Sequence, residues 1–170
     1  LAPITFQAPS ATIDATDPLD RTLATEAVFS ARSPELAIDG RGLQAELDRG
    51  LLELAHEGKV ELRRAAGEPA RFESTGAGPM QVRRGAAESD PVVLEAWEGV
   101  RLTLTEGTAG TLTARHVALR ARTEADGELA IERLDADGEV DWDSGDTDLQ
   151  GARLAADFDP EGRITLARLE

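Results

Sequence analysis

The chain has 170 residues, of which 41% are hydrophobic and 30% charged, a composition typical of a folded globular protein. Thirty-three acidic and 18 basic residues give a formal net charge of -15. Because such a field repels polyphosphate, we expect no nucleic-acid partner. The absence of cysteine excludes disulfides and thiolate chemistry. No stretch approaches the ~20 apolar residues that a membrane-spanning helix needs.

Apolar and polar residues alternate along most of the chain, which is the pattern of a β-strand with one buried and one wet face. The clearest run is Val100-Arg-Leu-Thr-Leu104, where Leu102 and Leu104 share one face and Thr103 and Thr105 the other. Similar runs occur at Leu36/Ile38, Leu52/Leu54, Val60/Leu62, Val92/Leu94/Ala96, Leu129/Ile131, Val140/Trp142 and Ile164/Leu166. The pattern predicts an all-β protein.

Turn signals that contain glycine separate these runs, since glycine accepts a positive φ and aspartate bonds its own backbone. They are Asp48-Arg49-Gly50, Glu57-Gly58, Asp126-Gly127, Asp137-Gly138 and Pro160-Glu161-Gly162. A unit of strand, glycine turn and strand recurs from Leu43, Leu112 and Leu149 onward. Each unit can bury its apolar face only against its neighbours, so we expect one elongated domain, residues 1–170, built of repeated antiparallel hairpins.

Two segments leave more than one assignment open. Residues 43–57 also fit a helix, because Leu43, Leu47, Leu51 and Leu54 fall on one helical face, although the repeat favours strands. The irregular segment 65–91 is rich in glycine and proline, and we expect a long loop or a pair of irregular edge strands there.

The sequence offers no candidate for catalysis. His56 and His116 are the two histidines, and neither has a second metal ligand at helical or hairpin spacing. Tyrosine is absent, and no serine lies in a nucleophile elbow. We therefore expect a protein that is not an enzyme and that needs no cofactor or metal.

Two motifs have a weak functional interpretation. Gly40-Arg-Gly42-Leu-Gln-Ala45 matches a dinucleotide-binding loop, but that loop needs parallel strands and crossover helices, so a simple turn is preferred. The acidic run 135–148 could hold calcium, yet its carboxylates alternate with Val140 and Trp142. A solvated strand face is therefore the preferred interpretation of the acidic run.

The apolar sides of the strands are rich in leucine, valine, isoleucine and alanine. On a curled sheet these residues either close on one another as a core or leave a slot for acyl chains. The sequence by itself favours the core.

Several segments resemble the OstA-like domain of lipopolysaccharide-transport proteins, from about Ala24 onward. They are Ala27-Val-Phe-Ser-Ala-Arg-Ser-Pro-Glu-Leu36-Ala-Ile38-Asp-Gly40, Leu43-Gln-Ala-Glu-Leu-Asp48, Gly58-Lys-Val60-Glu-Leu62 and Asp148-Leu-Gln-Gly-Ala-Arg-Leu-Ala-Ala-Asp-Phe-Asp-Pro-Glu-Gly-Arg-Ile-Thr-Leu166. The resemblance implies a twisted, V-shaped β-jellyroll, the β-taco, which is open along one side. Its apolar interior would shield lipid tails on their way to the outer membrane.

The resemblance also implies a periplasmic location and, in one branch of the family, an inner-membrane anchor in the full-length protein. The chain shows neither that anchor nor the export signal of the other branch, and it starts at Leu1, so we expect a mature or trimmed product. The implied partners are lipopolysaccharide or another acylated lipid, and related β-jellyroll proteins. Because a meander that does not close leaves unpaired backbone groups at both ends, near Ile4–Ala8 and Ile164–Leu169, we expect such proteins to pair with these edge strands.

The expected function is therefore periplasmic binding and bridging of lipid. The residues expected to line the lipid groove are Leu54, Leu62, Leu94, Leu102, Leu104, Leu119, Ile131, Trp142 and Ile164. The alternative is a structural or interaction module with a filled interior, which assembles through exposed strand edges and binds no lipid.

Overall fold

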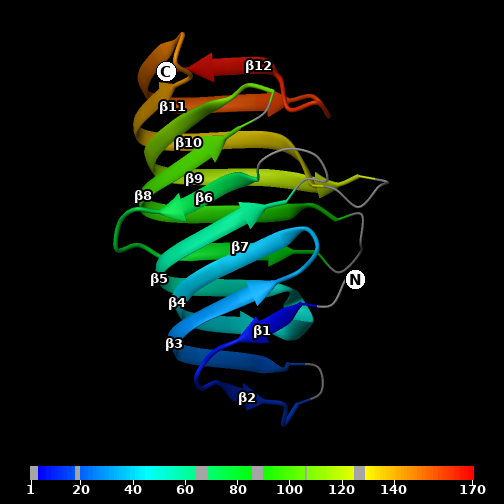
Figure 1. Ribbon diagram of the computed structural model, residues 1–170. Helices are drawn as coiled ribbons and strands as arrows, with labels where there is room; N and C mark the ends of the chain where they lie inside the picture. Colours follow the sequence, from blue (N-terminus) through cyan, green and yellow to red (C-terminus); the bar gives the residue numbers. More distant parts are fainter. Residues whose placement is uncertain (1–3, 18–19, 64–68, 86–89, 106, 125–128) are drawn as a thin grey trace.

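The computed structural model describes residues 4–17, 20–63, 69–85, 90–105, 107–124 and 129–170, which form one 12-stranded antiparallel sheet. The all-β prediction is confirmed. In Figure 1 the strands are stacked along one axis, from β2 at one end to β11 and β12 at the other. The strands are β1 (Thr5–Gln7), β2 (Thr12–Asp14), β3 (Thr22–Arg32), β4 (Leu36–Glu46), β5 (Leu51–Leu62), β6 (Ala70–Ser74), β7 (Met80–Arg84), β8 (Val92–Leu104), β9 (Gly110–Thr123), β10 (Leu129–Asp143), β11 (Asp148–Phe158) and β12 (Ile164–Leu169).

Strand order in the sheet follows chain order, except that two positions in the sheet are each shared by two short strands. β1 and β2 both pair with β3, so together they form one edge of the sheet, and β12 forms the other. β6 and β7 both lie between β5 and β8, each along a different half of these longer strands. The sheet is therefore a meander in which two positions, the one next to β3 and the one between β5 and β8, are each filled by two short strands.

A line of bulges bends the long strands near their middles. The register shifts between β3 and β4, β4 and β5, β8 and β9, β9 and β10, and β10 and β11 at corresponding levels. Glu57, Glu98 and Glu139 adopt positive φ angles of 53°, 61° and 54° on this line. Because a bulge adds an unpaired residue and sharpens the local twist, aligned bulges form a crease across the sheet.

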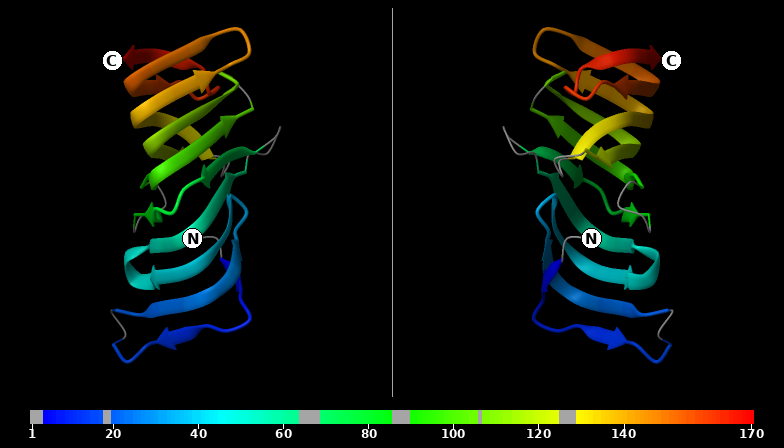
Figure 2. Two further views of the ribbon diagram at one scale, coloured as in Figure 1. Left: turned by 90° about the vertical axis from the view of Figure 1, so that its left-hand side faces the viewer. Right: turned by 90° about the vertical axis from the view of Figure 1, so that its right-hand side faces the viewer.

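The crease divides the sheet into two arms. The first arm contains β1, β6 and residues 28–40, 59–62, 100–104, 110–114 and 140–151. The second arm contains β2, β7, β12 and residues 22–25, 43–56, 92–97, 116–123, 129–137 and 153–158. Figure 2 shows the strands curving as they cross the stack, which brings the inner faces of the arms together.

The crease corrects several sequence predictions. Glu57-Gly58 and Asp137-Gly138 are not hairpin turns, because they lie inside β5 and β10. The segment Gly40–Ala45 is not a turn either, since it lies inside β4, and the next strand pairs with β4 antiparallel, whereas a dinucleotide-binding loop needs parallel strands. Residues typical of turns occur at these bulges because a bulge requires the same positive φ as a tight turn.

Other turn predictions have mixed outcomes. Asp48-Arg49-Gly50 is confirmed as a turn, formed by a short 3-10 helix, η1 (Leu47–Arg49), and Gly50 at a φ of 61°. Pro160-Glu161-Gly162 is also confirmed, because it connects β11 to β12. Asp126-Gly127 lies outside the described residues.

The two ambiguous segments are strands in their described parts. Residues 43–57 comprise the end of β4, η1 and the first half of β5, so the strand assignment holds over the helix. Segment 65–91 contains β6 and β7. The expectation that these are edge strands is wrong, because each has β5 on one side and β8 on the other.

The core lies between the two arms. Side chains on the inner faces form one continuous hydrophobic cluster, and Phe72, Leu54 and Leu94 are 0% exposed. Val140 and Trp142 are buried in this cluster, whereas Asp141 and Asp143 are exposed, as the alternation of the acidic run predicts. One sheet encloses its own core because every long strand contributes to both walls.

Candidate functional site: the interior of the folded sheet

The predicted groove residues all contribute to the inner face. Leu62, Leu102, Leu104 and Trp142 come from the first arm, and Leu54, Leu94, Leu119, Ile131 and Ile164 come from the second arm. All except Ile164 are only 0–4% exposed, so the interior is packed shut at these positions. Period-two alternation was sufficient to place them on one face. Their contact with lipid stays a prediction.

The apolar inner face becomes accessible at the ends of the stack. Paired residues on neighbouring strands share a face, so Ile13 lies on the inner face opposite Leu23, and Leu169 lies there opposite the buried Leu154. Ile13 is 64% exposed and Leu169 39% exposed. At the first end Phe6 stacks on Phe29, with ring centroids 5.8 Å apart. Apolar surface is therefore available at both ends without any opening of the core.

Both edges of the sheet, β1 and β12, lie where the sequence predicts them, and β2 also forms part of the first edge. In the described part of the chain β12 pairs only with β11, and β1 and β2 pair only with β3. Exposed apolar side chains accompany these strands, Ile4 beside β1 and Leu166 on β12. Unpaired backbone groups next to apolar side chains favour the addition of another strand.

On the side of the sheet opposite the crease, an ion pair joins the tips of the two arms. Glu35 lies in the turn before β4, at the tip of the first arm, and Arg84 ends β7 at the tip of the second arm. Arg84 Nη1 lies 3.0 Å from Glu35 Oε2, and the side chains are only 11% and 9% exposed. No pattern in the sequence predicts this pair, because the two residues belong to different hairpins and to no motif.

A second contact between the tips lies closer to β12. The backbone N–H of Thr108, in the turn before β9, donates to the carbonyl oxygen of Gly162 at 3.0 Å. The Thr108 hydroxyl oxygen, Oγ1, accepts a hydrogen bond from the backbone N–H of Ile164 at 2.9 Å. Thr108 belongs to the first arm and Gly162 to the second, so this contact also joins the tips on the side opposite the crease.

The outer face is polar and carries the histidines. The sequence shows no second ligand beside His116, but the fold brings two carboxylates to its ring. Nε2 lies 3.0 Å from Glu95 Oε1, and Nδ1 lies 3.4 Å from Asp137 Oδ2. Its ring stacks on Trp97 at 5.5 Å. His56 is exposed on β5. Within the described ranges, no group of three or more histidine, aspartate or glutamate residues is arranged to hold a metal ion.

Hydrogen bonds from basic residues lower the pKa of several outer carboxyls. The backbone N–H of Arg163 holds the pKa of Asp159 below its usual range, with a further contribution from the guanidinium. The ammonium of Lys59 lowers the pKa of Glu61. Asp159 lies in the turn that also presents Gly162 to Thr108, so its ionised form supports that turn.

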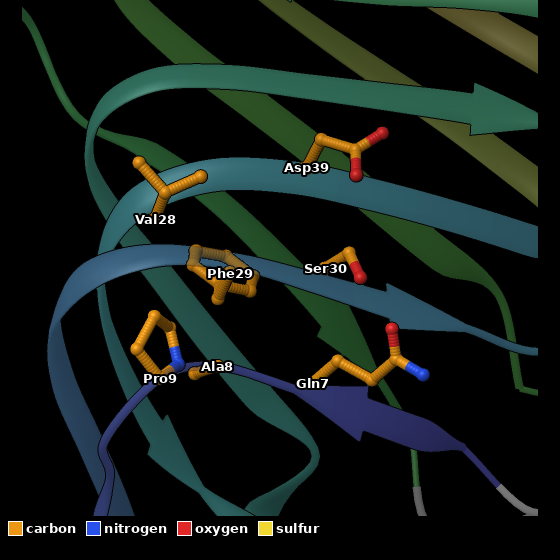
Figure 3. Close-up of a pocket in the computed structure, with 7 residues that line it drawn as sticks. All are labelled: Gln7, Ala8, Pro9, Val28, Phe29, Ser30 and Asp39. Atoms are coloured by element: carbon orange, nitrogen blue, oxygen red, sulfur yellow. The ribbon is translucent and has the colours of Figure 1, made fainter.

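A small pocket lies at the edge beside β1 (Figure 3). Its volume is about 380 Å³, at the lower end of the range for ligand pockets. It is lined by Gln7, Ala8, Pro9, Val28, Phe29, Ser30 and Asp39. The pocket forms where β1 ends and the chain crosses the crease toward β2, and it brings together no constellation of catalytic groups.

No family model matches this chain, and neither a curated protein nor a solved structure matches it. Among the residues that the structure describes, none belongs to a helix long and apolar enough to cross a membrane.

Proposed function

We propose that this protein is a periplasmic bridging domain that takes up the acyl chains of lipopolysaccharide, or of another acylated lipid, on the inner face of its sheet. The observation that carries the proposal is one apolar inner face that runs the length of a single creased sheet and is exposed at both ends. The OstA-like resemblance supports it, and the crease is compatible with the V-shaped β-jellyroll of that family.

Acyl chains suit this face because apolar contact is non-directional and scales with the area removed from water. Each buried methylene contributes about 0.8 kcal/mol. A chain could begin to bind at Ile13 or Leu169 and then replace contacts between the arms, at little cost, because one set of apolar contacts is exchanged for another. The anionic head group stays outside in water, since the protein itself carries a net charge of -15.

Bridging follows from the two edges of the sheet. A related domain that added a strand to β12, or to β1 and β2, would extend the backbone pairing and continue the inner face across the junction. Exposed inner-face residues at those ends, such as Leu169, would then be covered by the next domain. A lipid could pass between domains without meeting water.

The second candidate function is that of a structural module that uses the same edges and binds no lipid. The low exposure of the interior favours it, because Leu54, Leu94 and Leu102 leave no surface accessible to water. A filled interior is also the normal state of a protein core. The two candidates differ only in whether lipid ever displaces the packing between the arms.

Photo-crosslinking on β12 distinguishes them. Ala167 pairs with the inward Ala156, and the neighbouring Leu166 pairs with the outward Asp157, so the two positions face opposite sides of one strand. Both are exposed, which lets a photoreactive residue replace either without disturbing the core. With lipopolysaccharide as the probe, capture at Ala167 and not at Leu166 supports lipid binding. Capture at neither position, in folded protein, supports the structural module, and equal capture at both indicates non-specific adhesion.

A further inference from the structure

We propose that the contacts between the arm tips form a clasp, which controls lateral access of acyl chains to the interior. The clasp consists of the Glu35–Arg84 ion pair and of the hydrogen bonds that Thr108 makes with Gly162 and Ile164. This inference rests on the proposed function, because it concerns how the same interior is opened. Its mechanical part, that these contacts hold the arms together, is testable without lipid.

The position of the ion pair follows from strand register. Arg84 pairs with Val92, which is fully buried on the inner face, so the Arg84 side chain begins on that face at the very end of β7. Glu35 precedes Leu36, whose pairing with Leu62 places it at the end of the first arm. The ion pair therefore lies where the two walls meet, on the side opposite the crease.

Neither clasp contact belongs to the ladder of the sheet. Strand pairing holds neighbouring strands together within each arm, whereas the arms are joined to each other by the crease, by apolar packing and by contacts between the tips, which include the hydrogen bond from the Ile164 N–H to Thr108 Oγ1. The clasp contacts can therefore break without unpairing a strand. Rotation about the line of bulges would separate the tips while both arms keep their hydrogen bonds.

The ion pair is poorly satisfied in its closed state. Nε and Nη2 of Arg84 are buried without a hydrogen-bond partner, and Glu35 Oε2 lacks hydrogen-bond geometry even though it lies 3.0 Å from Nη1. The desolvation cost of a buried pair offsets much of its attraction, and opening would return all these groups to water. The ion pair should therefore add little to the free-energy difference between the closed and open states, and the main cost of opening lies in the apolar contacts between the arms, which a bound acyl chain would replace.

The second contact depends on a glycine at the tip of the first arm. Gly107 has a φ of 68°, and a Cβ at this position would overlap the carbonyl oxygen of Gly162. Gly107→Ala would therefore force the two turns apart while leaving the buried core unchanged. Glu35→Gln would remove the charge of the other contact and keep the size of the side chain.

The first test measures whether the tips separate. Spin labels at Arg71 on β6 and Arg83 on β7 report the distance between the arms, because both side chains are exposed and the strands belong to different arms. The Glu35→Gln/Gly107→Ala double variant should show a longer and broader distance distribution than the parent protein. An unchanged distribution in the folded variant would overturn the clasp, whatever the lipid result. Glu46→Gln, which removes an ion pair to Arg49 within the second arm and away from the crease, is the matched control and should change nothing.

The second test measures whether opening controls uptake. Because the chain has no cysteine, Glu35→Cys/Arg84→Cys can be joined selectively with a bismaleimide. Linking the tips should weaken binding of a pyrene-labelled fatty acid about tenfold, and the open double variant should bind it about tenfold more tightly than the parent. A link between Arg71→Cys and Thr103→Cys, which pair within the first arm, is the control and should have no effect. Equal binding by linked and unlinked tips would overturn the gating role alone. If no form binds the probe or lipopolysaccharide, the proposed function fails, and the spin-label distances still decide whether the clasp exists.

Discussion

Truncation of Leu102 to alanine tests whether the interior is a packed core. Leu102 is 0% exposed on β8, and the side chains directly opposite are Phe72 on β6 and Leu112 on β9, both also 0% exposed. Close packing leaves little room for collapse, so Leu102→Ala should lower the free energy of unfolding by about 3 kcal/mol, within the usual range of ~2–5 kcal/mol. For a domain of this size that corresponds to a fall in Tm of about 10 °C.

The neighbouring Thr103 gives the matched control. It faces outward between Arg71 and Thr111, so Thr103→Ala should cost less than about 1 kcal/mol, chiefly through strand propensity. Urea denaturation followed by tryptophan fluorescence measures both variants, and the m-value checks that the unfolding transition is unchanged. A cost for Leu102→Ala as small as that for Thr103→Ala would refute the reasoning. It would mean that the side chain borders an open slot in solution rather than a filled core.

Three further outcomes are expected. Glu98→Gly should raise the free energy of unfolding by up to about 1 kcal/mol in urea denaturation, because Glu98 has a φ of 61° on the crease. Asp159→Asn should lower Tm at pH 7, and the difference should vanish on acidification, because the depressed pKa of Asp159 contributes stability above its unfolded value of about 3.9 that is lost as the pH falls through the lower folded value. Replacement of Leu166 and Leu169 by lysine should reduce any self-association seen by sedimentation velocity, because charge on the exposed edge strand opposes strand addition.

Each of these expectations has a clear contrary result. A loss of stability in Glu98→Gly would show that the glutamate makes a contact worth more than its backbone strain. A difference between Asp159→Asn and the parent that persists at pH 2 would mean that the carboxylate charge is not the cause. Self-association that is unchanged by the lysine substitutions would place the contact away from β12.

The sequence by itself determined which side chains face inward. Leu102 and Leu104 alternate with threonines, and because the side-chain period of a strand is two, the register follows wherever one face is apolar. The same argument placed Leu54, Val140 and Trp142 correctly, and the expectation of a meander that does not close identified β12 as an edge. Local turn chemistry was sufficient at Gly50 and before β12, where the chain does reverse.

The tertiary structure decided whether a glycine signal reverses a strand or bends it. Glu57-Gly58 and Asp137-Gly138 carry the chemistry of a turn, yet both lie inside long strands, because neighbouring strands supply bulges at the same level and pairing continues across them. No pattern in the sequence predicts the clasp either. Glu35 and Arg84 belong to different hairpins, and only the bend at the crease brings the arm tips together, since proximity across a folded sheet depends on the sum of many small backbone rotations rather than on any local pattern.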